Sequence, residues 1–212
     1  MTQSYRPRAT GAAAAVALLL MLVTMAACGG DEAAPTTTAP EGFTVASNAK
    51  EGFALAIPSD WTQIPLKPNP ADLDTTDNAL RRENPKLASI LNQARVLGQS
   101  GGKFMAVAAD GVTSVNLTAD KAKEKTVEEV VTASIAGLTN VGATDIKQEP
   151  ATLGDKQAIR VTFRIPVQTD AGTVPTDEVQ YYVLEDGKAY ILTVAAAPAP
   201  VSAAVASSLR IR

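Results

Sequence analysis

Few residues of this sequence could carry out acid–base or nucleophilic chemistry. The chain has 212 residues, no histidine and one cysteine, Cys28. Without an imidazole base or a second thiol, serine triads and the usual zinc sites are excluded. Two Ser-x-x-Lys pairs remain, Ser47 with Lys50 and Ser100 with Lys103. That motif functions on a helix with Ser-Asp-Asn and Lys-Thr-Gly companions, but both pairs fall in predicted loops and the companions are absent. We therefore expect no catalytic residues and predict that the protein is not an enzyme.

One group of carboxylates invites a test for metal binding. Asp72, Asp74, Asp77 and Glu83 partly follow the ligand spacing of a calcium loop. However, Thr76 stands where the loop requires Asp or Asn, and Asp77 replaces the glycine of its sharp turn. An acidic first helical turn, which the helix dipole favours, explains the same residues. We expect no metal site and no cofactor.

The strongest signal lies at the N-terminus. Arg6 and Arg8 precede a nearly unbroken apolar run, residues 11–25, and small residues lead directly to Cys28. This pattern predicts a secretory signal peptide over residues 1–27. The cysteine at the cut resembles the lipobox of bacterial lipoproteins, which implies lipidation of Cys28 by a diacylglyceryl group. Plain secretion and an uncleaved anchor are the alternatives, although the apolar run is shorter than the about 20 residues that span a bilayer.

The predicted anchor and the charge indicate where the protein works. Two acyl chains hold a protein firmly to a bilayer, so the expected location is the extracytoplasmic face of the cell membrane. The net charge is −3, and removing residues 1–27 takes away Arg6 and Arg8 and leaves −5. An acidic chain does not favour nucleic acid or electrostatic binding to anionic lipid. We expect membrane contact through the lipid anchor alone and no nucleic-acid partner.

The chain after the leader divides into two parts. Residues 28–42 comprise the lipidated cysteine and a disordered tether, because they are rich in Pro, Thr, Ala and Gly and have no apolar face. Residues 43–212 form a single domain that begins near Phe43. A strand over 53–57 ends at Pro58, and Trp61 closes the end of the core.

Capping and turn residues define the elements of this domain. The patterns predict helices over 85–97, 126–138 and 201–207 and strands over 104–109, 113–118, 159–167, 179–184, 189–195 and 209–211. Thr126 begins a capping box, and Asp110-Gly111 and Asp186-Gly187 are hairpin turns. Ser134 falls on the buried stripe of the second helix, where its hydroxyl can bond to the carbonyl one turn earlier.

Several of these features occur together in a known fold. They are Gly52-Phe53 with Ile57-Pro58 and Trp61, a capped middle helix, a meander containing residues 187–192, and a terminal helix before a short last strand. The sequence resembles the PsbP-like α/β/α sandwiches, which include mycobacterial Lpq lipoproteins. The resemblance implies an α+β fold, an antiparallel β-sheet with helices packed on both faces. It also implies binding of protein partners and no shared catalytic residues.

These observations lead to one functional hypothesis and one main alternative. We expect a membrane-anchored extracytoplasmic lipoprotein that acts as a non-catalytic protein-binding or scaffold module with an unknown protein partner. The alternative is a carrier of a small apolar or lipid ligand, held between a helix and the sheet. Ala106, Ala108, Ala109 and residues 195–197 are small enough to leave room for such a pocket. A hydrolase is the third possibility.

Overall fold

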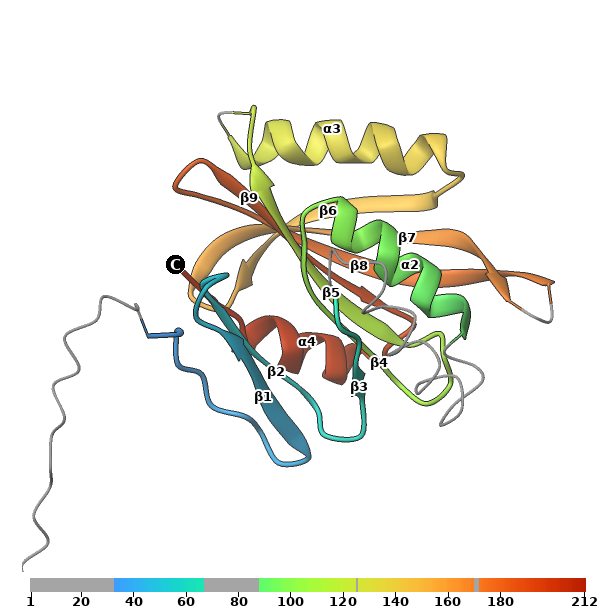
Figure 1. The fold of residues 1–212 in the computed structure, drawn as a ribbon. Helices are drawn as coiled ribbons and strands as arrows, with labels where there is room; N and C mark the ends of the chain where they lie inside the picture. Colours follow the sequence, from blue (N-terminus) through green and yellow to red (C-terminus); the bar gives the residue numbers. More distant parts are fainter. Residues whose placement is uncertain (1–32, 67–87, 125, 170–171) are drawn as a thin grey trace, which may run out of the picture. The chain divides into compact units, whose positions relative to one another are not determined.

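The computed structural model describes residues 33–66, 88–124, 126–169 and 172–212. Its described part is an α+β fold with two antiparallel sheets and three helices (Figure 1). The predicted leader, Cys28, the carboxylates of residues 72–83 and the first residues of the predicted helix 85–97 lie outside the described residues. Among the helices that are described, none is long and apolar enough to cross a membrane.

Within the described ranges, the larger sheet has seven strands in the order β3-β4-β5-β9-β8-β7-β6. All of its neighbouring strands pair antiparallel. The strands are β3 (Thr62–Gln63), β4 (Gly102–Val107), β5 (Ser114–Lys121), β6 (Thr144–Leu153), β7 (Lys156–Thr169), β8 (Gly172–Glu185) and β9 (Lys188–Ala195). The predicted hairpin at Asp110-Gly111 is confirmed by the pairing of β4 with β5, and the one at Asp186-Gly187 by the pairing of β8 with β9.

A second, smaller sheet covers part of the larger one. It has the order β1-β2-β10 and is formed by β1 (Phe43–Asn48), β2 (Phe53–Pro58) and β10 (Arg210–Ile211). Helix α4 (Ala199–Ser208) packs against β2 and β6. Leu55 and Ile57 of β2, Val205 of α4, and Leu117 and Leu192 of the larger sheet belong to one buried cluster, which is the main core. Trp61 packs against this core, as predicted.

The opposite face of the larger sheet carries the other two helices. Alternation along β4 separates the faces, because Phe104 lies in the main core whereas Met105 packs with α2 (Ala88–Gln99). Helix α3 (Val127–Asn140) packs on β7 and β8 through the predicted apolar stripe. Thr126 caps it in the predicted capping box. Helices therefore lie on both faces of an antiparallel sheet, and the predicted fold class is confirmed.

The predicted hydrogen-bond partner of Ser134 is wrong. Its hydroxyl lies 2.6 Å from the Tyr182 hydroxyl, which also donates to Gln180, and is not bonded to a carbonyl of its own helix. Tyr182 is fully buried beneath α3. A buried phenol needs a hydrogen-bond partner, and the serine of the facing helix supplies one.

The element boundaries differ from the prediction in several places. Strand β4 runs over 102–107 instead of 104–109, β5 extends to Lys121, and α2 continues through Gly98 to Gln99. The prediction omitted β6 and treated the domain as one sheet. Most residues of β6 are exposed, so they lack the apolar alternation that reveals a half-buried strand.

Candidate functional site

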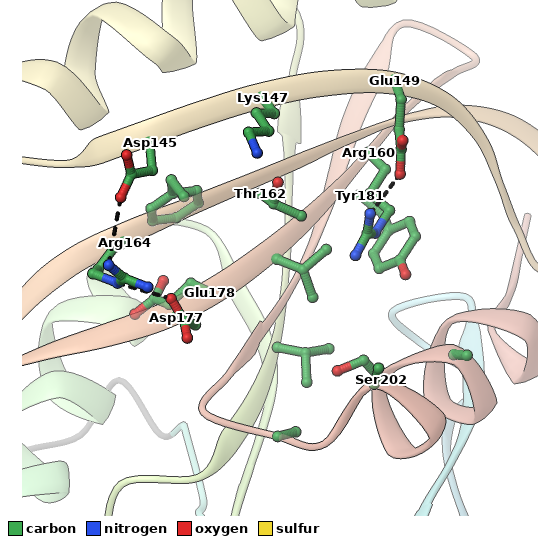
Figure 2. Close-up of a pocket in the computed structure, with 16 residues that line it drawn as sticks. Asp145, Lys147, Glu149, Arg160, Thr162, Arg164, Asp177, Glu178, Tyr181 and Ser202 are labelled. Carbon is green, nitrogen blue, oxygen red and sulfur yellow. Dashed lines mark hydrogen bonds and ion pairs between the residues drawn. The ribbon is translucent and has the colours of Figure 1, made fainter.

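The face of the larger sheet that carries α4 is partly open over β6, β7 and β8. A groove of about 630 Å³ lies there, bounded on one side by residues 197–203 at the start of α4 (Figure 2). We call it the charged groove. The side chains that define it are Asp145, Lys147, Glu149, Arg160, Thr162, Arg164, Asp177, Tyr181 and Ser202.

Cross-strand ion pairs organise the charged groove. Arg164 of β7 lies between two carboxylates, with Nε 3.0 Å from Asp177 and a terminal nitrogen 3.5 Å from Asp145. Arg160 contacts Glu149 of β6 at 2.5 Å. The antiparallel register causes this arrangement, because Arg164 pairs directly with Asp177 and Arg160 with Glu149. Opposite charges on facing strand positions stabilise such a sheet.

A lysine without an acidic neighbour opposite it lies between these two clusters. Lys147 pairs in the β6–β7 ladder with Thr162, which is neutral. No ion pair is found for Lys147 within the part of the chain that the structure describes. Figure 2 shows its side chain between the two arginine–carboxylate clusters. The centre of the charged groove therefore presents an exposed ammonium group above a hydroxyl.

The electrostatics keep the flanking arginine charged. Partial burial disfavours the charge of Arg160, but hydrogen bonds to Glu149 and Tyr181 outweigh that cost and raise its pKa. The two clusters and Lys147 contribute three acids and three bases, and Glu178 adds a fourth carboxyl group to the lining. A surface of mixed charge selects partners by complementarity more than by net charge.

A bulge in β6 positions Asp145. The register shifts between Thr144 and Lys147, so this strand carries one extra residue opposite β7. Asp145 takes up the bulge with a φ of 54°, a left-handed conformation that aspartate tolerates. β6 is also the edge of the sheet, and the bulge, its alternating charges and Pro150 all discourage pairing with another strand. A partner at this end of the sheet would therefore bind to the face of the sheet and not to its edge strand.

A separate small cavity lies on the opposite face. It has about 100 Å³ and is lined by residues from α2, β5, β8 and β9. Its polar lining consists of Gln93, Ser114, Asn116, Thr176, Glu178 and Thr193. Among the described residues that line it, Glu178 alone is charged, and burial raises the pKa of Glu178 to about 7.

This carboxyl makes the stability of the domain depend on pH. The native state holds the Glu178 proton more tightly than the unfolded chain, where the pKa is near 4.5. The stabilisation is complete below pH 4.5 and is lost as the pH rises towards 7, because the native state then binds more protons than the unfolded state. Allowing for partial exposure, we expect Glu178→Gln to raise the free energy of unfolding by about 1–3 kcal/mol at pH 8 and to change it little at pH 5. Urea unfolding at both pH values measures this, and equal effects at the two pH values would contradict it.

A further groove, of about 720 Å³, lies between α3 and the β6–β7 hairpin. Its charged lining consists of Glu128 and Glu149, and its remaining residues are apolar, amide or hydroxyl side chains. The described residues of this lining include no cation, whereas those of the charged groove combine cations, anions and hydroxyls. The charged groove is the more discriminating surface and is our candidate site.

The residues suggested by the sequence do not form a site. The Ser100 hydroxyl donates to the Val96 carbonyl at 2.9 Å, and Lys103 pairs with Glu51 at 2.8 Å. Ser47 and Lys50 are both exposed, in β1 and in the turn after it. Within the described ranges no group of His, Cys, Asp and Glu could hold a metal ion. The lipidation of Cys28 stays a prediction, because that residue lies outside the described part.

The alanines proposed for an apolar pocket are scattered over the domain. Ala106 is fully buried in the main core, and Ala109 and Ala196 are exposed. Ala195 lines the small cavity, while Ala197 lines the charged groove. These residues do not surround a common apolar cavity, so no observation favours the carrier alternative.

The sequence analysis missed the charged groove. Its signals were the alternating charges at Asp145, Lys147 and Glu149, and the two arginines at positions 160 and 164. Alternation shows that such residues share one face of a strand. It does not show that the two sets face each other, because that depends on the strand register.

Comparisons with known proteins concern the fold. No family model matches the chain, and no curated protein does. Among solved structures, a protein of Bacteroides thetaiotaomicron has 10% identity and a TM-score of 0.42, covering 76% of this chain but only 45% of that one. The chain thus spans less than half the length of that protein. Identities this low concern fold alone.

Two of the similar structures match the groups that the sequence resembles. Cyanobacterial PsbP (CyanoP) from Synechocystis has 12% identity and a TM-score of 0.48, covering 89% of this chain and 99% of that one. LpqN of Mycobacterium tuberculosis, described as involved in cell envelope biogenesis, has 11% identity and a TM-score of 0.42, covering 83% and 89%. The structural neighbours of this chain therefore include both a PsbP protein and an Lpq lipoprotein.

Proposed function

We propose that the protein is a membrane-anchored extracytoplasmic lipoprotein that acts as a non-catalytic protein-binding module, with the charged groove as its binding surface. The anchor rests on the leader and Cys28. The binding role rests on one observation, the exposed Lys147 held between two arginine–carboxylate clusters on the open face of the sheet.

The geometry of the groove fits recognition. Its arginines are already engaged by carboxylates of neighbouring strands, so their positions are fixed before a partner arrives. Preorganised charges lower the entropic cost of association. Among the bases that line the charged groove in the described part of the chain, Lys147 is the one without an ion pair to a carboxylate, so it is the natural contact for a carboxylate of the partner. A partner surface that places an acidic side chain at the centre of the groove fits this pattern.

Site-specific cross-linking in intact cells tests the proposal. A photo-reactive residue at Thr162, on the groove floor, should yield a discrete cross-linked species. The same residue at exposed Val141, at the end of α3, should not. We expect Lys147→Glu to reduce the Thr162 cross-link at least tenfold, about 1.4 kcal/mol of binding, with the thermal midpoint unchanged.

Two outcomes would contradict this function. One is equal cross-linking from positions 162 and 141. The other is a Thr162 cross-link that Lys147→Glu leaves intact. Either result would mean that the groove charges do not select a partner.

A further inference from the structure

Residues 33–42, the second part of the predicted tether, lie against the domain. They form no helix or strand. The Thr37 hydroxyl donates to the Ser208 carbonyl at 2.6 Å, and the Arg212 guanidinium donates to the Ala33 carbonyl at 2.8 Å. Ser208 is the last residue of α4, where the helix leaves its carbonyls without internal partners. Thr37 therefore provides a hydrogen-bond donor for a carbonyl that has no partner within α4.

Burial along this segment supports the same contact. Ala34, Pro35, Thr37 and Ala39 are half-buried, whereas the residues between Pro35 and Thr37 and between Thr37 and Ala39 are exposed. An alternation of this kind is typical of an extended strand of chain with one side on a surface. The segment is therefore docked along the domain as far as Ala33, and we call it the docked segment.

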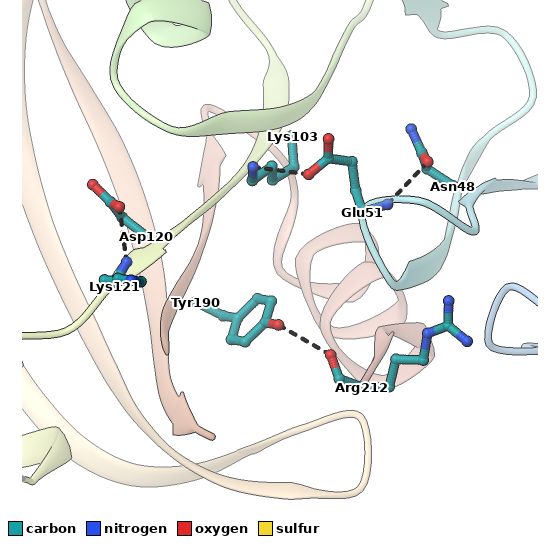
Figure 3. Close-up of polar contacts among 7 residues, drawn as sticks. All are labelled: Asn48, Glu51, Lys103, Asp120, Lys121, Tyr190 and Arg212. Carbon is teal, nitrogen blue, oxygen red and sulfur yellow. Dashed lines mark hydrogen bonds and ion pairs between the residues drawn. The ribbon is translucent and has the colours of Figure 1, made fainter. Parts of the chain in front are cut away.

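Arg212 is itself held firmly before it contacts the docked segment. Its backbone nitrogen donates to the Gly52 carbonyl at 3.2 Å, and its carbonyl accepts from the Tyr190 hydroxyl at 3.1 Å (Figure 3). The guanidinium also donates to the Ala49 carbonyl at 2.6 Å. Residues 48–52 form the turn between β1 and β2. Arg212 and this turn together form what we call the Arg212 clamp.

The clamp leaves little chain between the domain and the predicted anchor. Only residues 29–32 separate the acylated Cys28 from the clamped Ala33. Five residue spacings reach about 17 Å when fully extended, whereas loss of the Ala33 contact would leave nine spacings to Thr37, about 31 Å. The end of the domain that carries the Arg212 clamp is therefore kept near the point where the acyl chains enter the bilayer.

We propose that the Arg212 clamp orients the domain, with the 48–52 turn facing the membrane and the β7–β8 hairpin directed away from it. This inference rests on the proposed lipid anchor. The length of strand β8 gives the distance between the clamp end and the hairpin end of the larger sheet. Val183 pairs with Tyr190 near the clamp, and Val174 lies nine residues earlier in β8, about 30 Å along the strand. The clamp thus makes one end of the sheet membrane-proximal and the other membrane-distal.

The orientation can be measured in the lipidated full chain with two variants, each of which carries one added cysteine for a fluorescent label. Lys50→Cys places a fluorophore on the clamp turn, and Val174→Cys places one at the distal end; both positions are exposed. In phosphatidylcholine vesicles that contain a lipid with a nitroxide on its headgroup, we expect at least threefold stronger quenching at position 50 than at position 174. Arg212→Gln removes the donors to Ala33 and should bring the ratio close to one.

A matched control comes from the neighbouring arginine. Arg210 donates to the Ser207 and Leu209 carbonyls and makes no hydrogen bond to the docked segment. Arg210→Gln should therefore keep the threefold difference, and thermal unfolding of each variant reports whether it still folds.

The possible failures are distinguishable. A protein that does not float with the vesicles would overturn the proposed anchor. A protein that floats but shows equal quenching at positions 50 and 174, or stronger quenching at 174, would overturn the orientation alone. A quenching ratio that Arg212→Gln leaves unchanged would show that the clamp does not set it.

Discussion

Replacing Gly154 with alanine is expected to destabilise the domain by about 3 kcal/mol or more. Gly154 turns the chain between β6 and β7 with a φ of 62°. A Cβ atom there would lie 1.8 Å from the Leu209 carbonyl oxygen and 3.0 Å from its carbon. Both are backbone atoms, and Gly154 itself donates to the Ala206 carbonyl at 2.8 Å. The turn at Gly154 cannot move away from Leu209 without separating the β6–β7 hairpin from α4.

Gly187 provides the matched control for this substitution. It also has a left-handed conformation, with a φ of 71°, but a Cβ atom there would meet no atom of the described residues within 4 Å. Gly187→Ala should therefore cost only the backbone penalty, about 1 kcal/mol. Urea unfolding of both variants isolates the steric contribution as the difference. An equal decrease in the free energy of unfolding for both variants would mean that the Leu209 backbone does not restrict the side chain at position 154.

Cys28→Ser is expected to abolish attachment of fatty acid to the protein. The chain has no other cysteine, so no second thiol can accept an acyl group. Each buried methylene contributes about 0.8 kcal/mol to membrane binding, and a loss of two chains removes the whole anchor. Metabolic labelling with an alkyne fatty acid measures this directly, and we expect the labelled band to disappear.

A neighbouring substitution separates lipidation from damage to the leader. Met25→Leu keeps the apolar run and the thiol, so labelling should continue at the level of the unmodified protein. Persistent labelling of Cys28→Ser would place the fatty acid elsewhere and would contradict the anchor.

Local rules predicted those parts of the fold that depend on neighbouring residues. The capping box at Thr126 and the turns at Asp110 and Asp186 are short-range signals, and each is found where the sequence places it. The two sheets needed long-range information. β10 is only two residues long and pairs with β2 from the far end of the chain, which no periodicity can reveal.

The candidate site was harder to predict for a related reason. Lys147, Arg160 and Asp177 come from three strands, and they line one groove only because the register aligns those strands. The partner of Ser134 likewise depended on which residue of β8 lies beneath α3. Sequence patterns predicted which residues share a face, but three-dimensional pairing decides which charges neutralise one another and which remain exposed.

The most direct test of the account is the mass of the N-terminal peptide of the native protein, purified from its own cells. We expect a mature chain that begins at Cys28, with a diacylglyceryl group on its sulfur. An intact leader, or a chain that starts at an unmodified Cys28, would contradict the lipid anchor on which the proposed location, function and orientation depend.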